Sequence, residues 1–279
     1  MKIIKYIALI LCACLVAVFQ MGLNSFDSGL LNQEIVTGYG ITATAVFIYG
    51  ACAFIYRLFD LLYQMIFAST LQQITETVTL TMQKRYSKYK AIWQDGNSYL
   101  SAMERATKCL SEGVFKYSLY LIPSGFNTII ITRNILTTGN IEIIPVIVGV
   151  VAVQMWIIYT VQKSQLSDRQ IANLTKFNGL QKDLYLTAAS EAEFLQEVET
   201  IRKDVICIPK IILDYLPDII SSIGLCILLQ FVDIEKRALF ANAYSQGVYS
   251  IGYYGGLILR NYIQYQQYIK LIKSGGTQK

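Results

Sequence analysis

The fold of this chain is decided by residues 41–68, which read ITATAVFIYGACAFIYRLFDLLYQMIFA. Apart from Arg57 and Asp60 this stretch carries no charge, and it is long enough for a helix to cross a hydrocarbon core of ~30 Å. No Gly or Pro follows it closely, so we expect residues 69–93 to continue the helix with polar side chains on one side. At the rise of an α-helix, the stretch from Ile41 to Trp93 would be on the order of 75 Å long. The pattern therefore predicts a helix that crosses a membrane and projects into the cytoplasm.

The composition of the whole chain indicates the same class. Hydrophobic residues make up 54% and charged residues 15% of the 279 residues, whereas soluble domains carry about 25% charged residues. Disorder requires low hydrophobicity and high charge. A collagen-like chain requires far more glycine and proline than the 18 Gly and 4 Pro present. A polytopic membrane protein is the class that remains.

Working outward from the first stretch gives six apolar segments. Two long polar stretches, residues 69–113 and 163–204, interrupt them, and we expect both to be helical extensions in the cytoplasm. The predicted fold class is an all-α membrane protein with a single transmembrane domain over residues 1–279. The expected membrane spans are residues 3–23, 41–68, 114–136, 141–162, 205–232 and 238–260.

Turn and capping signals place the helix that follows the first extension. Asp95-Gly96-Asn97 is a turn signal. Ser101 and Glu104 match the Ser-x-x-Glu capping box, which predicts a helix that starts near Ser101.

The distribution of positive charge sets the expected orientation. Most of the 24 Lys and Arg residues fall before the first span, in the two extensions and in the tail. Because cytoplasmic loops carry the excess of Lys and Arg, we expect both termini and both extensions in the cytoplasm. The expected location is the bacterial inner membrane, with lipid as the surrounding partner. For residues 3–23, a cleaved signal peptide is an alternative to a retained span.

A charge inside the hydrocarbon is costly unless it meets a partner or water, so each one is a candidate for function. Arg57 and Asp60 share one face of the second span at i, i+3. They form either an internal ion pair or part of a cavity wall.

The fifth span carries three charges on one face, because Lys210, Asp214 and Asp218 are spaced by four. Pro209 and Pro217 flank them, and each proline frees a backbone carbonyl that needs protein or water as a partner. The pattern favours a water-filled cavity over a buried salt-bridge network.

The sixth span is rich in tyrosine. Tyr249, Tyr253 and Tyr254 fall near its middle, away from the interfacial positions that tyrosine prefers. We expect them to line a polar, aromatic cavity. The alternative is that Gly252, Gly255 and Gly256 mark a close contact between helices.

The sequence lacks the residues that several common catalytic and binding sites require. The chain has no His, which removes Ser-His-Asp and Cys-His catalysis. Its six cysteines form no CxxC pair, and no phosphate-binding Walker motif occurs. Its net charge of +5 is spread out rather than clustered as nucleic-acid binding requires. We therefore expect no catalytic residue, metal site, cofactor or nucleic-acid partner, and no enzyme activity.

Three short segments carry a resemblance to a known family. Residues 19–30 (FQMGLNSFDSGL), 85–93 (RYSKYKAIW) and 102–106 (AMERA) resemble motifs of the SbmA/BacA peptide transporters. The second of these, a tyrosine-tryptophan elbow, is also similar to the peroxisomal and cobalamin subfamily of ABC exporters. The resemblance implies an ABC-exporter-like transmembrane domain without an ATPase domain. It places Trp93 and Arg105 at a cytoplasmic elbow, and we assign Asp95, from the turn signal between them, to the same elbow.

The resemblance implies a homodimeric transporter that imports peptides or peptide-like compounds by alternating access, with a proton gradient in place of ATP. The carboxylates expected to carry protons are Asp60, Asp214 and Asp218, with Glu112 at the cytoplasmic rim. One alternative is the membrane subunit of an ABC transporter powered by a separate ATPase chain, which would dock at residues 95–98 and 187–190. Another is a membrane scaffold or insertase-like factor.

Overall fold

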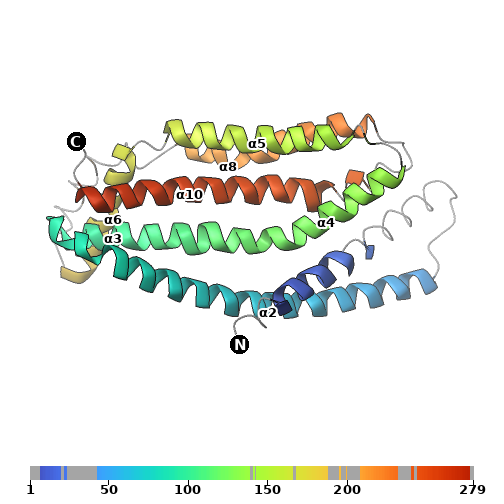
Figure 1. The fold of residues 1–279 in the computed structure, drawn as a ribbon, viewed down its shortest axis with the longest axis horizontal. Coiled ribbons are helices and arrows are strands. Elements are labelled where there is room, and N and C mark those ends of the chain that lie inside the picture. The colour runs from blue at the N-terminus through green and yellow to red at the C-terminus, as the bar shows by residue number, and fades with distance from the viewer. Residues whose placement is uncertain are drawn as a thin grey trace. The chain divides into compact units, whose positions relative to one another are not determined.

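The computed structural model describes residues 7–19, 22–23, 43–138, 141, 143–165, 168–187, 195, 199, 208–231, 240–241 and 244–276. Within these ranges the chain is almost entirely helical and contains no strand (Figure 1). The all-α prediction is therefore confirmed. The chain divides into two compact units, which are described separately below.

The longest helix is α2, which spans Ala43–Tyr86 and has 44 residues. A 3₁₀ helix, η1 (Ser87–Ile92), continues it, as the absence of helix breakers predicts. In the part of the chain that the structure describes, the segment Val46–Ile92 is the one helix long and apolar enough to cross a membrane. The apolar helices Ile7–Phe19, Ile144–Thr160 and Ile219–Phe231 are shorter. Six membrane spans thus stay a prediction.

The first unit comprises residues 1–70, 118–155 and 217–255. It holds helix Ile7–Phe19, the first part of α2 and most of α4, which spans Lys116–Thr138. It also holds parts of α5 (Ile143–Gln165) and α8 (Ile208–Leu229), and the π-helical turn η4 (Ser245–Tyr249). A core of buried side chains gathers around its last helical segments: Leu228, Phe240, Tyr244 and Val248.

Glycines allow α10 (Ser250–Ser274) to approach α5 closely. A Cβ atom added at Gly252 would overlap the side chain of Gln154, and one at Gly255 would overlap Met155. Small residues that permit such approach are typical of helix contacts in membranes. The alternative prediction for these glycines, a close contact between helices, is confirmed.

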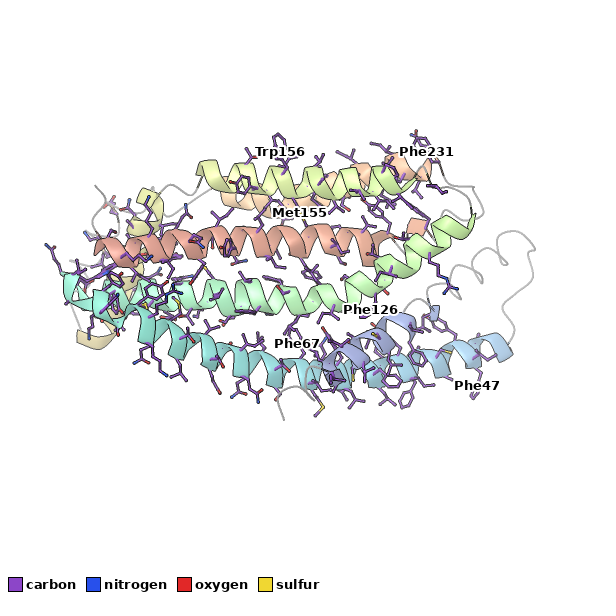
Figure 2. All side chains as sticks on the ribbon, viewed as in Figure 1. Phe47, Phe67, Phe126, Met155, Trp156 and Phe231 are labelled. Atoms are coloured by element: carbon purple, nitrogen blue, oxygen red, sulfur yellow. The ribbon has the colours of Figure 1, made fainter. Side chains whose placement is uncertain are left out.

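Large apolar side chains project from the helices of this structure (Figure 2). Phe47 of α2 is 78% exposed, Trp156 of α5 65% and Phe231 57%. In the most apolar 18-residue stretch of the helical segment Val46–Ile92, only 6% is buried. Exposed apolar side chains along a helix are what contact with lipid requires.

The second unit comprises residues 71–117, 156–216 and 256–279. It contains the end of α2, α3 (Gly96–Lys108), the π-helical turn η2 (Cys109–Phe115), α6 (Asp168–Thr187) and most of α10. Its core is formed by buried side chains from all of these helices: Val78, Met82, Tyr86, Tyr99, Ala102, Ala106, Cys109, Ile171, Tyr268, Ile269, Leu271 and Ile272.

The start of α3 differs from the prediction. The helix begins at Gly96, and its N-cap is Asp95, whose carboxylate accepts hydrogen bonds from the backbone N–H groups of Asn97 and Ser98 at 2.9 Å. Ser101 and Glu104 therefore lie inside the helix, and the predicted capping box is wrong. Asp is among the strongest N-cap residues, so the turn signal at residue 95 was the true start of the helix.

Candidate functional site

Six aromatic rings form a continuous ladder inside the first unit. It joins α2 and α4 to the segment formed by η4 and the start of α10. Neighbouring ring centroids lie between 4.7 and 5.9 Å apart, within the range of favourable aromatic pairs. The rings, in order, belong to Tyr63, Phe67, Tyr120, Tyr254, Tyr253 and Tyr249.

Helix periodicity explains how the ladder forms. Tyr63 and Phe67 are four residues apart, and both are buried on one face of α2. The π-helical turn η4 immediately precedes the tyrosines of α10, and π-turns within helices occur often at functional sites. The sequence indicated that Tyr249, Tyr253 and Tyr254 act together, and the structure brings them together as half-buried, contacting rings. That they line a cavity stays a prediction.

Asp60 and Arg57 occupy different environments on α2. Asp60 is half-buried and lies one turn before Tyr63 on the same face of the helix. Arg57 is exposed, and its guanidinium carbon lies 5.5 Å from the centroid of the Tyr56 ring. Both side chains belong to the described part of the chain, and no ion pair joins them. Asp60 and Arg57 therefore do not form the internal ion pair that the sequence offered as one alternative. A place for either side chain in a cavity wall stays a prediction.

A polar stripe on α4 continues away from the ladder. Tyr120, Ser124 and Asn127 follow one another at helical spacing, and the last two are 6% and 3% exposed. The hydroxyl of Ser124 donates to the backbone oxygen of Tyr120 at 3.3 Å. The Oδ1 atom of Asn127 is buried and has no hydrogen-bond partner among the residues that the structure describes. Because an unpaired buried acceptor costs about 1–3 kcal/mol, Asn127 is a candidate contact for a hydrogen-bond donor on a bound molecule.

The other charged residues predicted to carry protons or to line the cavity lie apart from this stripe in the sequence. Lys210, Asp214 and Asp218 belong to α8, but their side chains lie outside the described part of the structure. Glu112 lies in η2 and is exposed. Its neighbour Gly113 packs directly against Asn261 of α10. The roles predicted for these four charged residues stay predictions.

The cytoplasmic elbow predicted at Trp93 caps the end of α10. The indole Nε1 of Trp93 donates a hydrogen bond to the backbone oxygen of Ile272 at 3.1 Å. Gly275 and Gly276 have φ angles of 69° and 80°, and the N–H of Gly276 donates to the backbone oxygen of Leu271 at 3.3 Å. Two carbonyls that the helix end leaves without partners are thereby satisfied. Trp93 is thus a structural link between the elbow and α10.

Asp95 has a structural role at the same elbow. Burial raises the pKa of its carboxyl, but hydrogen bonds from Ser98 and from the N–H groups of Asn97 and Ser98 outweigh that effect. The net result is a pKa below the ordinary value of an aspartate. The charged carboxylate is therefore the form that caps α3.

Arg105 and its neighbour Glu104 attach α3 to α6. The Nη2 atom of Arg105 lies 3.3 Å from Oδ1 of Asn178. Glu104 forms ion pairs with Lys182 at 2.6 Å and with Lys108 at 3.0 Å. Hydrogen bonds from Lys182 and then Lys108 lower the pKa of Glu104 to about 2. Arg105 therefore has a structural role, because it joins α3 to α6 within the second unit.

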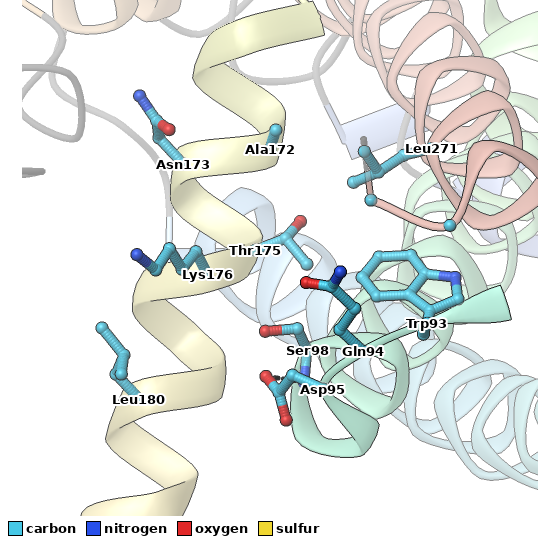
Figure 3. Close-up of a pocket in the computed structure, with 12 residues that line it drawn as sticks. Trp93, Gln94, Asp95, Ser98, Ala172, Asn173, Thr175, Lys176, Leu180 and Leu271 are labelled. Atoms are coloured by element: carbon cyan, nitrogen blue, oxygen red, sulfur yellow. Dashed lines mark hydrogen bonds between the residues drawn. The ribbon is translucent and has the colours of Figure 1, made fainter. Parts of the chain in front are cut away.

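A pocket of about 440 Å³ lies beside the elbow (Figure 3). Its volume is within the range of sites that bind small molecules. Both apolar and polar groups line it, among them one acid, Asp95, and one base, Lys176. Its lining comes from the elbow, α6 and the end of α10: Trp93, Gln94, Asp95, Ser98, Ala172, Asn173, Thr175, Lys176, Leu180, Leu271, Gly275 and Gly276.

Three of the ladder residues were missed by sequence reasoning. Tyr63 and Phe67 follow Asp60 at i+3 and i+7, a spacing that puts all three on one helix face and could have identified them. Tyr120 had no such signal, because its role depends on which helices pack against α4.

A metal site and similarity to known proteins are two further sources of information about function. Within the described ranges, no group of three or more His, Cys, Asp or Glu side chains could hold a metal ion. Comparison of the sequence with models of protein families found no match, and comparison with curated proteins found none either. The ladder and the neighbouring Asp60 are therefore the features from which a function can be proposed.

Proposed function

We propose that this chain is a transmembrane transporter that imports peptides or peptide-like compounds by alternating access, driven by a proton gradient. The observation that carries the proposal is the aromatic ladder, with the unneutralised carboxylate of Asp60 one turn before its first ring. Aromatic faces bind apolar and cationic groups. A carboxylate within a membrane span is a candidate proton carrier.

The proposal also assigns a topology, an oligomeric state and a proton path to the chain. Six spans cross the bacterial inner membrane, and both termini lie in the cytoplasm. Two copies form a homodimer, as in the SbmA/BacA transporters that the elbow motif resembles. Asp214 and Asp218 share proton transfer with Asp60, and Glu112 receives the proton at the cytoplasmic rim.

Reconstitution tests the energy source directly. The purified chain is placed in liposomes without any ATPase, a pH gradient is imposed, and uptake from a mixture of short peptides is measured by mass spectrometry. We expect uptake in wild type and strong loss in Asp60→Asn. Asp95→Asn, which changes a carboxyl of the elbow, is the control and should keep most uptake. No uptake by the wild-type chain would overturn the proposal.

The ladder is tested by a matched pair at Tyr254. Tyr254→Phe keeps the ring that stacks on Tyr120 at 5.5 Å, whereas Tyr254→Leu removes it. If the ring surface binds substrate, the leucine variant should raise KM and the phenylalanine variant should not. Equal KM values in both variants would contradict a role for the ladder in binding.

A second candidate function is the membrane subunit of an ABC transporter with a separate ATPase chain. The observation that favours it is the exposed η1 segment, where Ile92 is 55% exposed beside the elbow pocket. An ATPase that co-purifies with wild type but not with Ile92→Asp would support this function. ATP-independent uptake in the liposome assay would exclude it.

A further inference from the structure

Helix α4 lacks one backbone hydrogen bond because Pro123 lies within it. Proline has no N–H group, so the carbonyl four residues earlier, that of Leu119, loses its helical donor. A lipid environment offers no substitute donor, and every backbone polar group there needs a partner within the protein or from water.

The missing donor comes from another helix. The hydroxyl of Tyr63 on α2 donates to the backbone oxygen of Leu119 at 3.1 Å. Tyr63 is 2% exposed, and its ring is the first of the ladder. The two residues are 56 positions apart in the chain, so this hydrogen bond exists only while α2 and α4 are in contact.

A neighbouring hydrogen bond provides a comparison. The hydroxyl of Ser124 donates to the backbone oxygen of Tyr120, also at the proline. Both partners belong to α4, so this bond persists when α4 moves. Only the bond from Tyr63 depends on the distance between the two helices.

We propose that the hydrogen bond from Tyr63 to Leu119 is a latch that couples separation of α2 and α4 to the entry of water. When the helices separate, the Leu119 carbonyl has no donor in its own helix, and water is the partner that remains. When they close, Tyr63 replaces that water. The use of this latch in a transport cycle rests on the proposed function, whereas the latch itself does not.

A double-mutant cycle tests the latch without any transport assay. Tyr63→Phe should lower the Tm of the chain in detergent by about 2–4 °C, the shift expected when one hydrogen bond of ordinary strength is lost from a chain of this size. In the background of Pro123→Ala, residue 123 donates to Leu119 itself, so Tyr63→Phe should change Tm by far less. Equal shifts in both backgrounds would overturn the latch.

Hydrogen exchange provides a second measurement that does not need the proline variant to fold. With Pro123 kept, Tyr63→Phe should increase amide hydrogen exchange in the peptide covering residues 116–127. Ser124→Ala, which removes the bond within α4, is the matched control and should not increase exchange to the same extent. Unchanged exchange in Tyr63→Phe would contradict the latch. If the double-mutant cycle gives the expected result but the wild-type chain shows no uptake in liposomes, the transport proposal is refuted and the latch is not.

Discussion

The sharpest consequence of the structure concerns Trp93. Its Nε1 donor satisfies the backbone oxygen of Ile272, a residue that is 0% exposed near the end of α10. Trp93→Phe keeps an aromatic ring but removes this donor. The carbonyl of Ile272 would then be buried without the indole donor.

The expected magnitude follows from that carbonyl. An unsatisfied buried polar group costs about 1–3 kcal/mol. For a chain of this size, each kcal/mol corresponds to a change in Tm of about 2–4 °C. We therefore expect Trp93→Phe to lower Tm by at least about 2 °C. Amide exchange in the peptide covering residues 268–276 should rise, because the end of α10 loses a tie to the elbow.

The chain offers a matched control. It contains two tryptophans, and the other, Trp156, is 65% exposed. Trp156→Phe makes the same chemical change at a surface site, where the expected effect on stability is within about 0.5 kcal/mol. Far-UV circular dichroism on heating in detergent measures both variants, and each retains a single tryptophan for fluorescence. If Trp93→Phe is no less stable than Trp156→Phe, the argument that the indole caps α10 is refuted.

Three further predictions follow. Glu104→Gln should reduce the free energy of unfolding at pH 7 by no more than about 1 kcal/mol, since the ion pairs of Glu104 are half-exposed. The pKa of Glu104 in the folded state is lowered to about 2, so the ion pairs stabilise the fold only while the carboxylate is charged. The difference in stability between the variant and wild type should therefore shrink as the pH falls from about 4.5 toward 2. Asp95→Ala should cost about 0.5–2 kcal/mol through loss of the N-cap, measured by urea unfolding, whereas Asp95→Asn should cost less. Gly252→Ala should destabilise the chain by about 1–3 kcal/mol in thermal unfolding, because the added Cβ overlaps the buried side chain of Gln154, which has to shift. Gly149→Ala, which meets open space, should be neutral or stabilising.

The extent of α2 could be predicted because it depends on neighbouring residues in the chain. The long α2 helix followed from an uninterrupted run without Gly or Pro, and its end near residue 93 agrees with the structure. The start of α3 was misplaced because two capping signals competed within a few residues. Asp95 prevailed over Ser101 because its carboxylate reaches two free N–H groups in the first turn.

The candidate site was only partly accessible from sequence. Tyr249, Tyr253 and Tyr254 stood out because tyrosine is unusual in the middle of an apolar helix. Phe67 and Tyr120, which complete the ladder, did not stand out. Phenylalanine is common in apolar helices, and the role of Tyr120 depends on which helices pack against α4. The ladder depends on contacts between helices that are more than fifty residues apart in the chain, and no spacing rule encodes those.

The all-α class could be predicted from the sequence alone. Apolar runs without helix breakers favour long helices, because helix formation depends on residues within one or two helical turns of each other. Only the tertiary structure decided what individual side chains do. It made Trp93 the cap of α10, joined Arg105 to α6, and supplied the carbonyl freed by Pro123 with the hydroxyl of Tyr63. Each of these is a donor meeting an acceptor from another helix, and such pairs depend on the packing of whole helices rather than on neighbours in the chain.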